Sequence, residues 1–232
     1  MPAEFDRFSG SYEDLLKDPI RDRFAESGHA FFHRRKLEVL IEFLKKQSFD
    51  PSRLSLLDVG CGKGDFLELS APHFCRLAGC DPSQEMLQQM AGKSIAVKTQ
   101  ETPTILPYDA ALFDVVTAIC VFHHVPIEAR RALLQEIHRV LRRDGVLCII
   151  EHNPLNPLTQ MIVRRTPVDA DAQLLTAGLS KRLARQNGFE VTSVQNFLYV
   201  PEKLYARMGW AEQLLAHVPL GGQYSMFCRK VS

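Results

Sequence analysis

One stretch of the chain, from Leu54 to Phe66, constrains the fold more than any other. It opens with a short apolar run up to Val59, typical of a buried strand, and continues into three closely spaced glycines, Gly60, Gly62 and Gly64. Because glycine has no Cβ and adopts positive φ freely, such a loop lets the backbone approach a ligand, and the helix start beyond it offers unpaired N–H groups. The stretch predicts a strand, a tight loop and a helix start that bind a small polar molecule.

The spacing of the glycines differs from that of dinucleotide-binding sites. In the dinucleotide fingerprint the last glycine falls three positions after the second, where this chain has Asp65. The pattern here is G-x-G-x-G, and Asp58 precedes the first glycine by two positions. This spacing argues against a nicotinamide oxidoreductase.

The segment Asp-Val-Gly-Cys-Gly-Lys-Gly, which begins at Asp58, resembles motif I of the class I S-adenosylmethionine (SAM) dependent methyltransferases. In that family the glycine loop lies against the methionine part of SAM, and an acidic residue about twenty positions further on binds the ribose hydroxyls. Asp81 occupies that position, at the end of a second expected strand. Two carboxylate oxygens can accept hydrogen bonds from both hydroxyls. The resemblance therefore implies SAM as the cofactor.

Other segments match the same family. Leu106-Pro107-Tyr108 and Phe113-Asp114 are in register with it, and this register places Thr102 where family members have an acidic residue that faces adenine. A leading Phe-x-x-x-x-x-x-Tyr element closes over SAM in similar small-molecule methyltransferases. Phe5 and Tyr12 match its spacing, with core packing as the alternative for both rings. The cofactor-binding residues that the resemblance implies are Tyr12, Asp58, Gly60, Cys61, Gly62, Gly64, Asp81, Pro82, Thr102 and Cys120.

Short apolar runs alternate with helical patterns along most of the chain, which indicates a mainly parallel sheet with right-handed crossovers. The resemblance implies a Rossmann-like α/β fold of seven strands, in the order 3-2-1-4-5-7-6. We expect one methyltransferase domain over residues 1–232, with an N-terminal helical extension at 1–50. Ligands bind beyond the carboxyl ends of such strands, where Gly60, Asp81, Cys120 and Glu151 fall.

Composition narrows the partners. The 232 residues carry a net charge of +1, and basic pairs are interspersed with acids, so we expect no nucleic-acid partner. Six cysteines lack the spacing of a zinc site or a disulfide framework, which favours a reduced, cytoplasmic compartment. The N-terminus lacks an apolar signal region, and no apolar run reaches the roughly 20 residues of a membrane span. The sequence leaves the oligomeric state open.

Three histidines follow the expected fourth and fifth strands. His123 and His124 come after the fourth, and His152 after the fifth. Histidine is the usual base near neutral pH, so we assign His124 and His152 as candidate catalytic residues, with packing or a backbone hydrogen bond as the alternative. Glu151 and His152 could join His123 around a metal, but too few ligands can be placed and no metal site is predicted.

These features predict SAM-dependent methyl transfer to a small-molecule acceptor, with oxygen favoured over nitrogen or carbon as the attacking atom. The segment 153–176 follows the fifth strand, and we expect it to cover the acceptor site. Two alternatives stay open: methylation of RNA or protein, and a binding module that holds SAM without catalysis.

Overall fold

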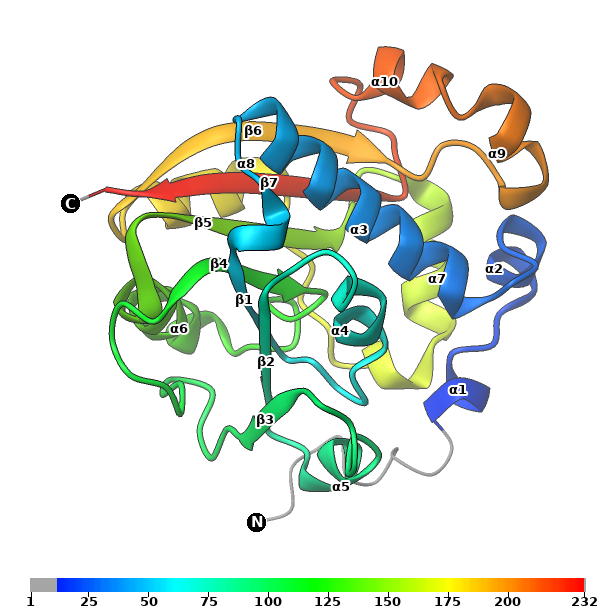
Figure 1. Cartoon of the computed structure of the whole chain (residues 1–232). Coiled ribbons are helices and arrows are strands. Elements are labelled where there is room, and N and C mark those ends of the chain that lie inside the picture. Colours follow the sequence, from blue (N-terminus) through cyan, green and yellow to red (C-terminus); the bar gives the residue numbers. More distant parts are fainter. Residues whose placement is uncertain (1–11, 232) are drawn as a thin grey trace.

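The computed structural model describes residues 12–231 and contains a sheet of seven strands in the order β3-β2-β1-β4-β5-β7-β6 (Figure 1). This order confirms the prediction. The strands are β1 (Ser55–Val59), β2 (Arg76–Asp81), β3 (Ala96–Thr99), β4 (Phe113–Ile119), β5 (Leu141–His152), β6 (Phe189–Phe197) and β7 (Gln223–Lys230). The helices are α1 (Tyr12–Leu15), α2 (Pro19–Phe24), α3 (His29–Lys46), α4 (Asp65–Ser70), α5 (Gln84–Gln88), α6 (Ile127–Val140), α7 (Pro157–Arg165), α8 (Ala177–Arg185), α9 (Glu202–Met208) and α10 (Ala211–Leu215), with short 3-10 turns η2 (Pro51–Arg53) and η3 (Pro167–Asp169).

The first five strands pair in parallel, whereas β7 runs antiparallel to both β5 and β6. Every residue of β1 is buried, and β4 is buried along most of its length. Strands covered on both faces must be apolar throughout, which is why both read as continuous apolar runs. Parallel pairing brings the carboxyl ends of β1, β2, β4 and β5 to one edge of the sheet, where the site forms.

Two layers of helices cover the sheet (Figure 1). On one face α3 and α4 bury a core with the inward side chains of β1, β4, β5 and β7, and Phe43 stacks on Phe227 with ring centroids 3.9 Å apart. On the other face α6 and α8 bury a second core around Phe113 and Tyr224. Burial of apolar area on both faces stabilises the sheet and fixes the positions of the strand ends.

Two segments differ from the sequence-based expectation. The pattern of residues 204–216 predicts one helix, but the structure has two short helices, α9 and α10, separated at Gly209 and Trp210. The prolines of residues 153–167 argue against a long helix, but this segment after β5 contains a nine-residue helix, α7. Its prolines do not prevent it, because Pro157 occupies the first turn, where no intrahelical N–H bond is lost, and the side chain of Asn156 accepts a hydrogen bond from the N–H of Thr159.

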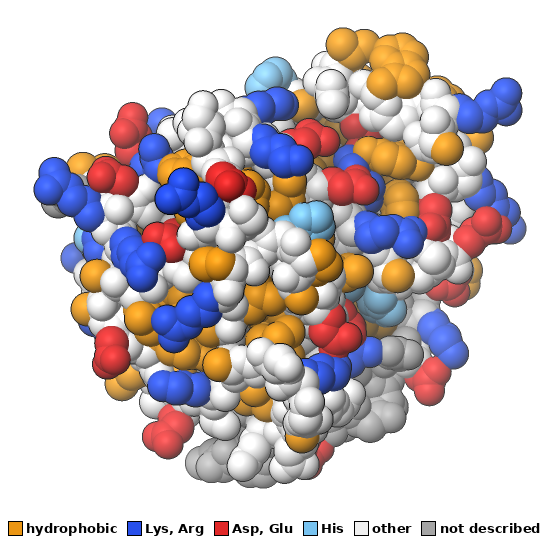
Figure 2. All heavy atoms as spheres, in the orientation of Figure 1, with side chains coloured by type: hydrophobic (Ala, Val, Ile, Leu, Met, Phe, Trp, Pro, Cys, Tyr) orange, Lys and Arg blue, Asp and Glu red, His pale blue; other side chains and the backbone are white. Residues whose placement is uncertain are grey.

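The surface carries both signs of charge. Lys and Arg side chains are interspersed with Asp and Glu over the face in Figure 2, with no large area of one sign. Within residues 12–231, no helix has both the length and the apolar character needed to cross a membrane.

Candidate active site

A cavity of about 820 Å³ lies beyond the carboxyl ends of the parallel strands. Its floor is the glycine loop after β1 and the ends of β2, β4 and β5, and its walls include residues of α2, α3, α7 and η3. The segment around α1 and α2 packs against η3 and α7, so two parts of the chain far apart in sequence meet along the cavity wall. The volume is within the range of pockets that bury a small organic ligand.

The glycine loop has the backbone geometry that its sequence predicts. Gly60, Gly62 and Gly64 all have positive φ, at 70°, 53° and 85°. A Cβ on Gly60 would lie 2.6 Å from Val121, so that glycine is required by packing. A Cβ on Gly62 would meet nothing within 4 Å, because this residue faces the cavity. The loop is therefore tightly packed at its start and open to a ligand at its centre.

Asp81 holds this loop in place. Its Oδ2 accepts a hydrogen bond from the N–H of Gly62 (2.8 Å), and its Oδ1 accepts one from the N–H of Ser83 (2.8 Å). The side chain is buried and lines the cavity beside Pro82. Each carboxylate oxygen has a second lone pair, so Asp81 can position the glycine loop and still accept from a ligand hydroxyl.

Asp58 lies beneath the loop and is almost fully buried. Burial raises the pKa of its carboxyl to about 7, although the Thr117 hydroxyl donates to Oδ1 (2.6 Å) and the Lys36 ammonium contributes a lowering charge. A carboxyl poised in this way changes charge readily when a cation binds beside it. Asp58 lines the cavity and is suited to an ammonium group.

Of the ten cofactor-binding residues that the sequence implies, seven line the cavity. They are Asp58, Gly60, Cys61, Gly62, Asp81, Pro82 and Cys120.

Gly64 lies behind the loop, where it is the left-handed N-cap of α4 and packs against Met90. Its part is to shape the loop. Thr102 does not line the cavity, because it is exposed and bridges to Ile105 in a turn, which leaves Glu101 and Pro103 on the cavity wall. Thr102 therefore lies outside the cavity lining, and its contact with adenine stays a prediction. Phe5 and the side chain of Tyr12 lie outside the described part of the structure.

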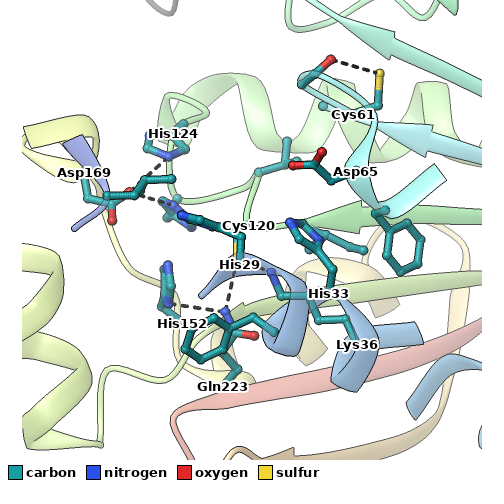
Figure 3. A pocket seen from close by; sticks show the side chains of 18 of the residues that line it. His29, His33, Lys36, Cys61, Asp65, Cys120, His124, His152, Asp169 and Gln223 are labelled. Carbon is teal, nitrogen blue, oxygen red and sulfur yellow. Dashed lines mark hydrogen bonds and ion pairs between the residues drawn. The ribbon is translucent and has the colours of Figure 1, made fainter. Parts of the chain in front are cut away.

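The end of β4 provides a thiol. Cys120 has an unusual positive φ of 57°, which turns its side chain toward Gln223 and Lys36, with Sγ 3.3 Å from Nε2 of Gln223 and 3.9 Å from Nζ of Lys36. Burial raises the pKa of this thiol, but Lys36 and His152 outweigh burial and lower the pKa to about 7. Figure 3 shows Cys120 at the centre of the cavity, between the histidines and the α3 side chains.

Glu151 organises the loop after β4. Its Oε1 accepts hydrogen bonds from the N–H groups of Val121 (3.1 Å) and Phe122 (2.7 Å), and its Oε2 lies 2.5 Å from Nδ1 of His123. Burial raises the pKa of Glu151, but His123 outweighs burial and holds the pKa below its usual value. Burial opposes the charge on His123, yet Glu151 and Asp169 raise its pKa to about 10. This buried pair fixes the ring of His123.

His124 is the histidine best suited to accept a proton. It is half-buried on the cavity wall, and its Nε2 lies 3.4 Å from Oδ1 of Asp169 (Figure 3). Burial lowers the pKa of His124 and outweighs the raising effect of Asp169, so the ring is neutral at pH 7. Burial also raises the pKa of Asp169, but His123 and His124 hold it well below its usual value. A neutral histidine beside an ionised carboxylate has the arrangement of a general base and its orienting group.

His152 lies on the same wall, with Nδ1 3.5 Å from Nε2 of Gln223. Its ring is 5.2 Å from that of His123, measured between centroids. The structure therefore brings both candidate catalytic residues, His124 and His152, into one cavity with the cofactor residues.

The cavity has two electrostatically different sides. The acids Asp58, Asp81 and Glu101 lie at the ends of the first three strands. The opposite side carries the basic side chains of Arg21, His33 and Lys36 together with the three histidines and Asp169.

Sequence reasoning missed the α3 side chains, Asp169 and Gln223. The sequence contained one signal for the α3 side chains: His29, His33 and Lys36 have helical spacing, which places them on one polar face of the helix.

The chain is similar in sequence and in fold to known methyltransferases. Residues 57–149 match the family model described as a methyltransferase domain. Over 121 residues the chain is 31% identical to a tRNA (carboxymethyluridine(34)-5-O)-methyltransferase of Arabidopsis thaliana, a match that covers 52% of this chain and 29% of that protein. Over 124 residues it is 33% identical to a demethylmenaquinone methyltransferase of Lactococcus lactis, covering 49% of this chain and 48% of that protein. The chain thus spans less than half the length of these curated relatives.

A solved structure extends the likeness to the whole fold. It is that of a SAM-dependent methyltransferase of Thermotoga maritima, described as a possible histamine N-methyltransferase, with a TM-score of 0.69. The match covers 97% of this chain and 98% of that one at 19% identity, so it shows the fold alone. The sheet order, the glycine loop and the matched domain together define an α/β methyltransferase fold with a glycine-rich cofactor loop. Residues 57–149 are therefore a SAM-dependent methyltransferase domain, and SAM is its cofactor.

Proposed function

We propose that this protein transfers the methyl group of SAM to an oxygen atom of an acceptor whose reacting part enters the cavity. The observation that carries the proposal is the neutral His124 beside the ionised Asp169, on the wall opposite the glycine loop. Asp58, Gly62 and Asp81 hold the donor, so the methyl group is presented toward the centre of the cavity.

The chemistry needs little from the protein beyond alignment, exclusion of water and removal of one proton. The acceptor oxygen attacks the methyl carbon, the bond between sulfur and methyl breaks, and the sulfonium becomes a neutral thioether. For a hydroxyl acceptor, His124 takes the proton. For a carboxylate acceptor no proton is lost, and the basic side chains Arg21 and Lys36 stabilise the anion before attack.

A small acceptor fits the enclosure of the site. The segments around α2 and α7 close over the cavity, and Nη1 of Arg165, the last residue of α7, lies 3.9 Å from Oδ2 of Asp18. Bound SAM would occupy a large share of the volume, so the remaining space suits a compact acid or phenol rather than a folded polymer.

RNA is the second candidate, because several curated relatives are tRNA methyltransferases. A single uridine base that is flipped out of its stack would fit the same cavity. The interspersed surface charge and the net charge of +1 weigh against this candidate, since RNA binding favours a basic face.

Incubation with methyl-deuterated SAM tests the proposal. The protein is mixed in turn with carboxylic acids, phenols, amines and an unmodified or carboxymethylated tRNA, and products are read by mass spectrometry. We expect a methyl ester or ether together with the demethylated cofactor. Methylation of amines alone would contradict the oxygen assignment. SAM binding with no acceptor-dependent turnover would favour a binding module. Reaction of tRNA alone, with salt-sensitive binding, would favour the RNA candidate.

A further inference from the structure

A group of side chains in the acceptor half of the cavity has the composition of a metal site. His123, His152 and Asp169 each offer one ligand atom, and the three atoms all lie within 4.8 Å of one another. They come from three separate places in the chain: the loop after β4, the last residue of β5, and η3. A set of two imidazole nitrogens and one carboxylate oxygen binds divalent transition metals such as Zn²⁺, Fe²⁺ and Co²⁺ more tightly than it binds Mg²⁺.

The orientation of His123 is an independent observation that points to a ligand. Its Nδ1 lies 2.5 Å from Oε2 of Glu151, and its side chain is fully buried. Its Nε2 has no hydrogen-bond partner among residues 12–231. The nearby Oδ1 of Asp169 is 3.6 Å away, which is too long for a hydrogen bond. A histidine that binds a metal through one ring nitrogen usually donates its other N–H to a carboxylate, which is the arrangement that Glu151 provides.

His152 is held by a different kind of contact, with the side-chain amide of Gln223 in place of a carboxylate. Metal binding through its Nε2 requires this amide to turn, so that Oε1 of Gln223, which is buried and has no hydrogen-bond partner among residues 12–231, accepts the proton of Nδ1. Nε2 of Gln223 lies 3.5 Å from Nδ1 of His152, on the side of the ring that faces β7. Figure 3 shows the ring of His152 between Gln223 and Asp169, so that its other edge is turned toward the carboxylate.

The distances suit a dication, and its charge replaces that of the proton which His123 releases from Nε2 when a metal binds. Ligand atoms about 2.0–2.1 Å from a tetrahedral zinc ion are about 3.4 Å from one another, close to the 3.6 Å between His123 and Asp169. Asp169 lies on a short 3-10 turn in the cavity wall, and movements of about 1.5 Å or less would bring the remaining ligand atoms into range. Glu151 and Asp169 together supply two negative charges.

We propose that His123, His152 and Asp169 bind one divalent transition-metal ion in the acceptor half of the cavity, with Glu151 orienting His123 and at least one coordination position left open. The open position faces the cavity and takes an oxygen ligand. If the proposed oxygen methylation is correct, this ligand is the acceptor oxygen, whose proton the metal makes easier to remove. Metal binding itself does not depend on that function.

Titration of the chelator-treated full chain with Co²⁺ tests the site without SAM or acceptor present. We expect one Co²⁺ per chain, visible absorption bands from nitrogen and oxygen ligands, and displacement by Zn²⁺. His152→Gln and Asp169→Asn should each weaken binding by about tenfold or more. His33→Gln is the matched control, because it removes a cavity histidine outside the set and should leave the affinity unchanged. Circular dichroism checks that each variant is folded.

X-ray absorption of the zinc-loaded wild type keeps the proposal testable if a variant does not fold, because it counts imidazole ligands directly. Two imidazoles and an oxygen are expected. No stoichiometric binding, or equal affinity in the wild type and all three variants, would overturn the metal site. A separate titration of the wild type with SAM distinguishes the proposed function from the metal site. If the wild type did not bind SAM, the proposed function would fail, and the metal result would be unaffected.

Discussion

The two halves of the cavity are built in different ways. The donor half comes from nearly consecutive segments, the glycine loop after β1 and the end of β2, joined by the contact between Gly62 and Asp81. The acceptor half is assembled from the segment around α2, from α3, from the ends of β4 and β5, and from α7 and η3. A site that holds an invariant donor can be encoded locally, whereas an acceptor site is shaped by distant segments that vary independently.

The halves differ in charge as well as in construction. Asp58, Asp81 and Glu101 line the donor half, where a sulfonium and an ammonium must be accommodated, and Arg21, Lys36 and Asp169 line the acceptor half together with the histidines. If this division is correct, substitutions in one half should change donor affinity and those in the other should change the rate of transfer. Each prediction below tests that separation.

The largest effect is expected from His124→Gln. Removal of a general base lowers kcat by about 10²- to 10⁴-fold for a hydroxyl acceptor, while the dissociation constant of SAM stays unchanged. Steady-state kinetics and a SAM titration measure the two quantities. A carboxylate acceptor provides the internal control, because it needs no base and its rate should fall far less. Equal losses with both acceptors would show that His124 is not the base.

Asp81→Ala should have the next largest effect, on the donor side. Loss of a charged group that accepts from Gly62 and from the cofactor costs about 1.5–3 kcal/mol, which weakens SAM binding by about tenfold to about a hundredfold. Calorimetry gives the affinity. Asp109→Ala is the matched control, since Asp109 is exposed and outside the cavity lining. Wild-type affinity in Asp81→Ala would remove this residue from the donor half.

Two alanine substitutions divide the roles of the glycine loop. Gly60→Ala brings a Cβ within 2.6 Å of Val121, so we expect a loss of about 1–3 kcal/mol in unfolding free energy beyond the backbone strain. Gly62→Ala shares the positive φ but meets no protein atom, so it should mainly obstruct SAM. Thermal unfolding and SAM titration of both variants make the comparison. Equal stability of the two variants would contradict it.

The smallest predicted effect is on pH dependence. Burial raises the pKa of Asp58 to about 7 in the cofactor-free protein, so the carboxyl is mostly protonated below that pH. A cation that binds beside Asp58 favours its ionised form, and the affinity for SAM should fall about tenfold from pH 8 to pH 6 as the proton must be displaced. Asp58→Asn corrects for titration of SAM itself, and its profile should be flatter. Parallel profiles in the two proteins would exclude Asp58 from the donor contact.

The sheet and most of the donor half follow from the sequence, because buried parallel strands read as apolar runs and the loop between them needs glycine. The position of Thr102 could not be read from the motif register, because its bridge to Ile105 forms a local turn that leaves Glu101 and Pro103 in the cavity lining instead. The acceptor half could be placed only approximately. The contacts of Asp169 with His124 and of Lys36 with Cys120 depend on how η3 and α3 pack in the folded protein. Local sequence patterns do not predict such packing.

A single set of SAM titrations compares the donor half with the acceptor half of the cavity. The wild type, Asp81→Ala and His124→Gln are compared by calorimetry under one buffer condition, and methyl transfer is measured in parallel. Asp81→Ala should lose at least tenfold in SAM affinity, whereas His124→Gln should keep wild-type affinity and lose turnover. Weakened SAM binding in His124→Gln to the same extent as in Asp81→Ala would contradict the division of the cavity into a donor half and an acceptor half.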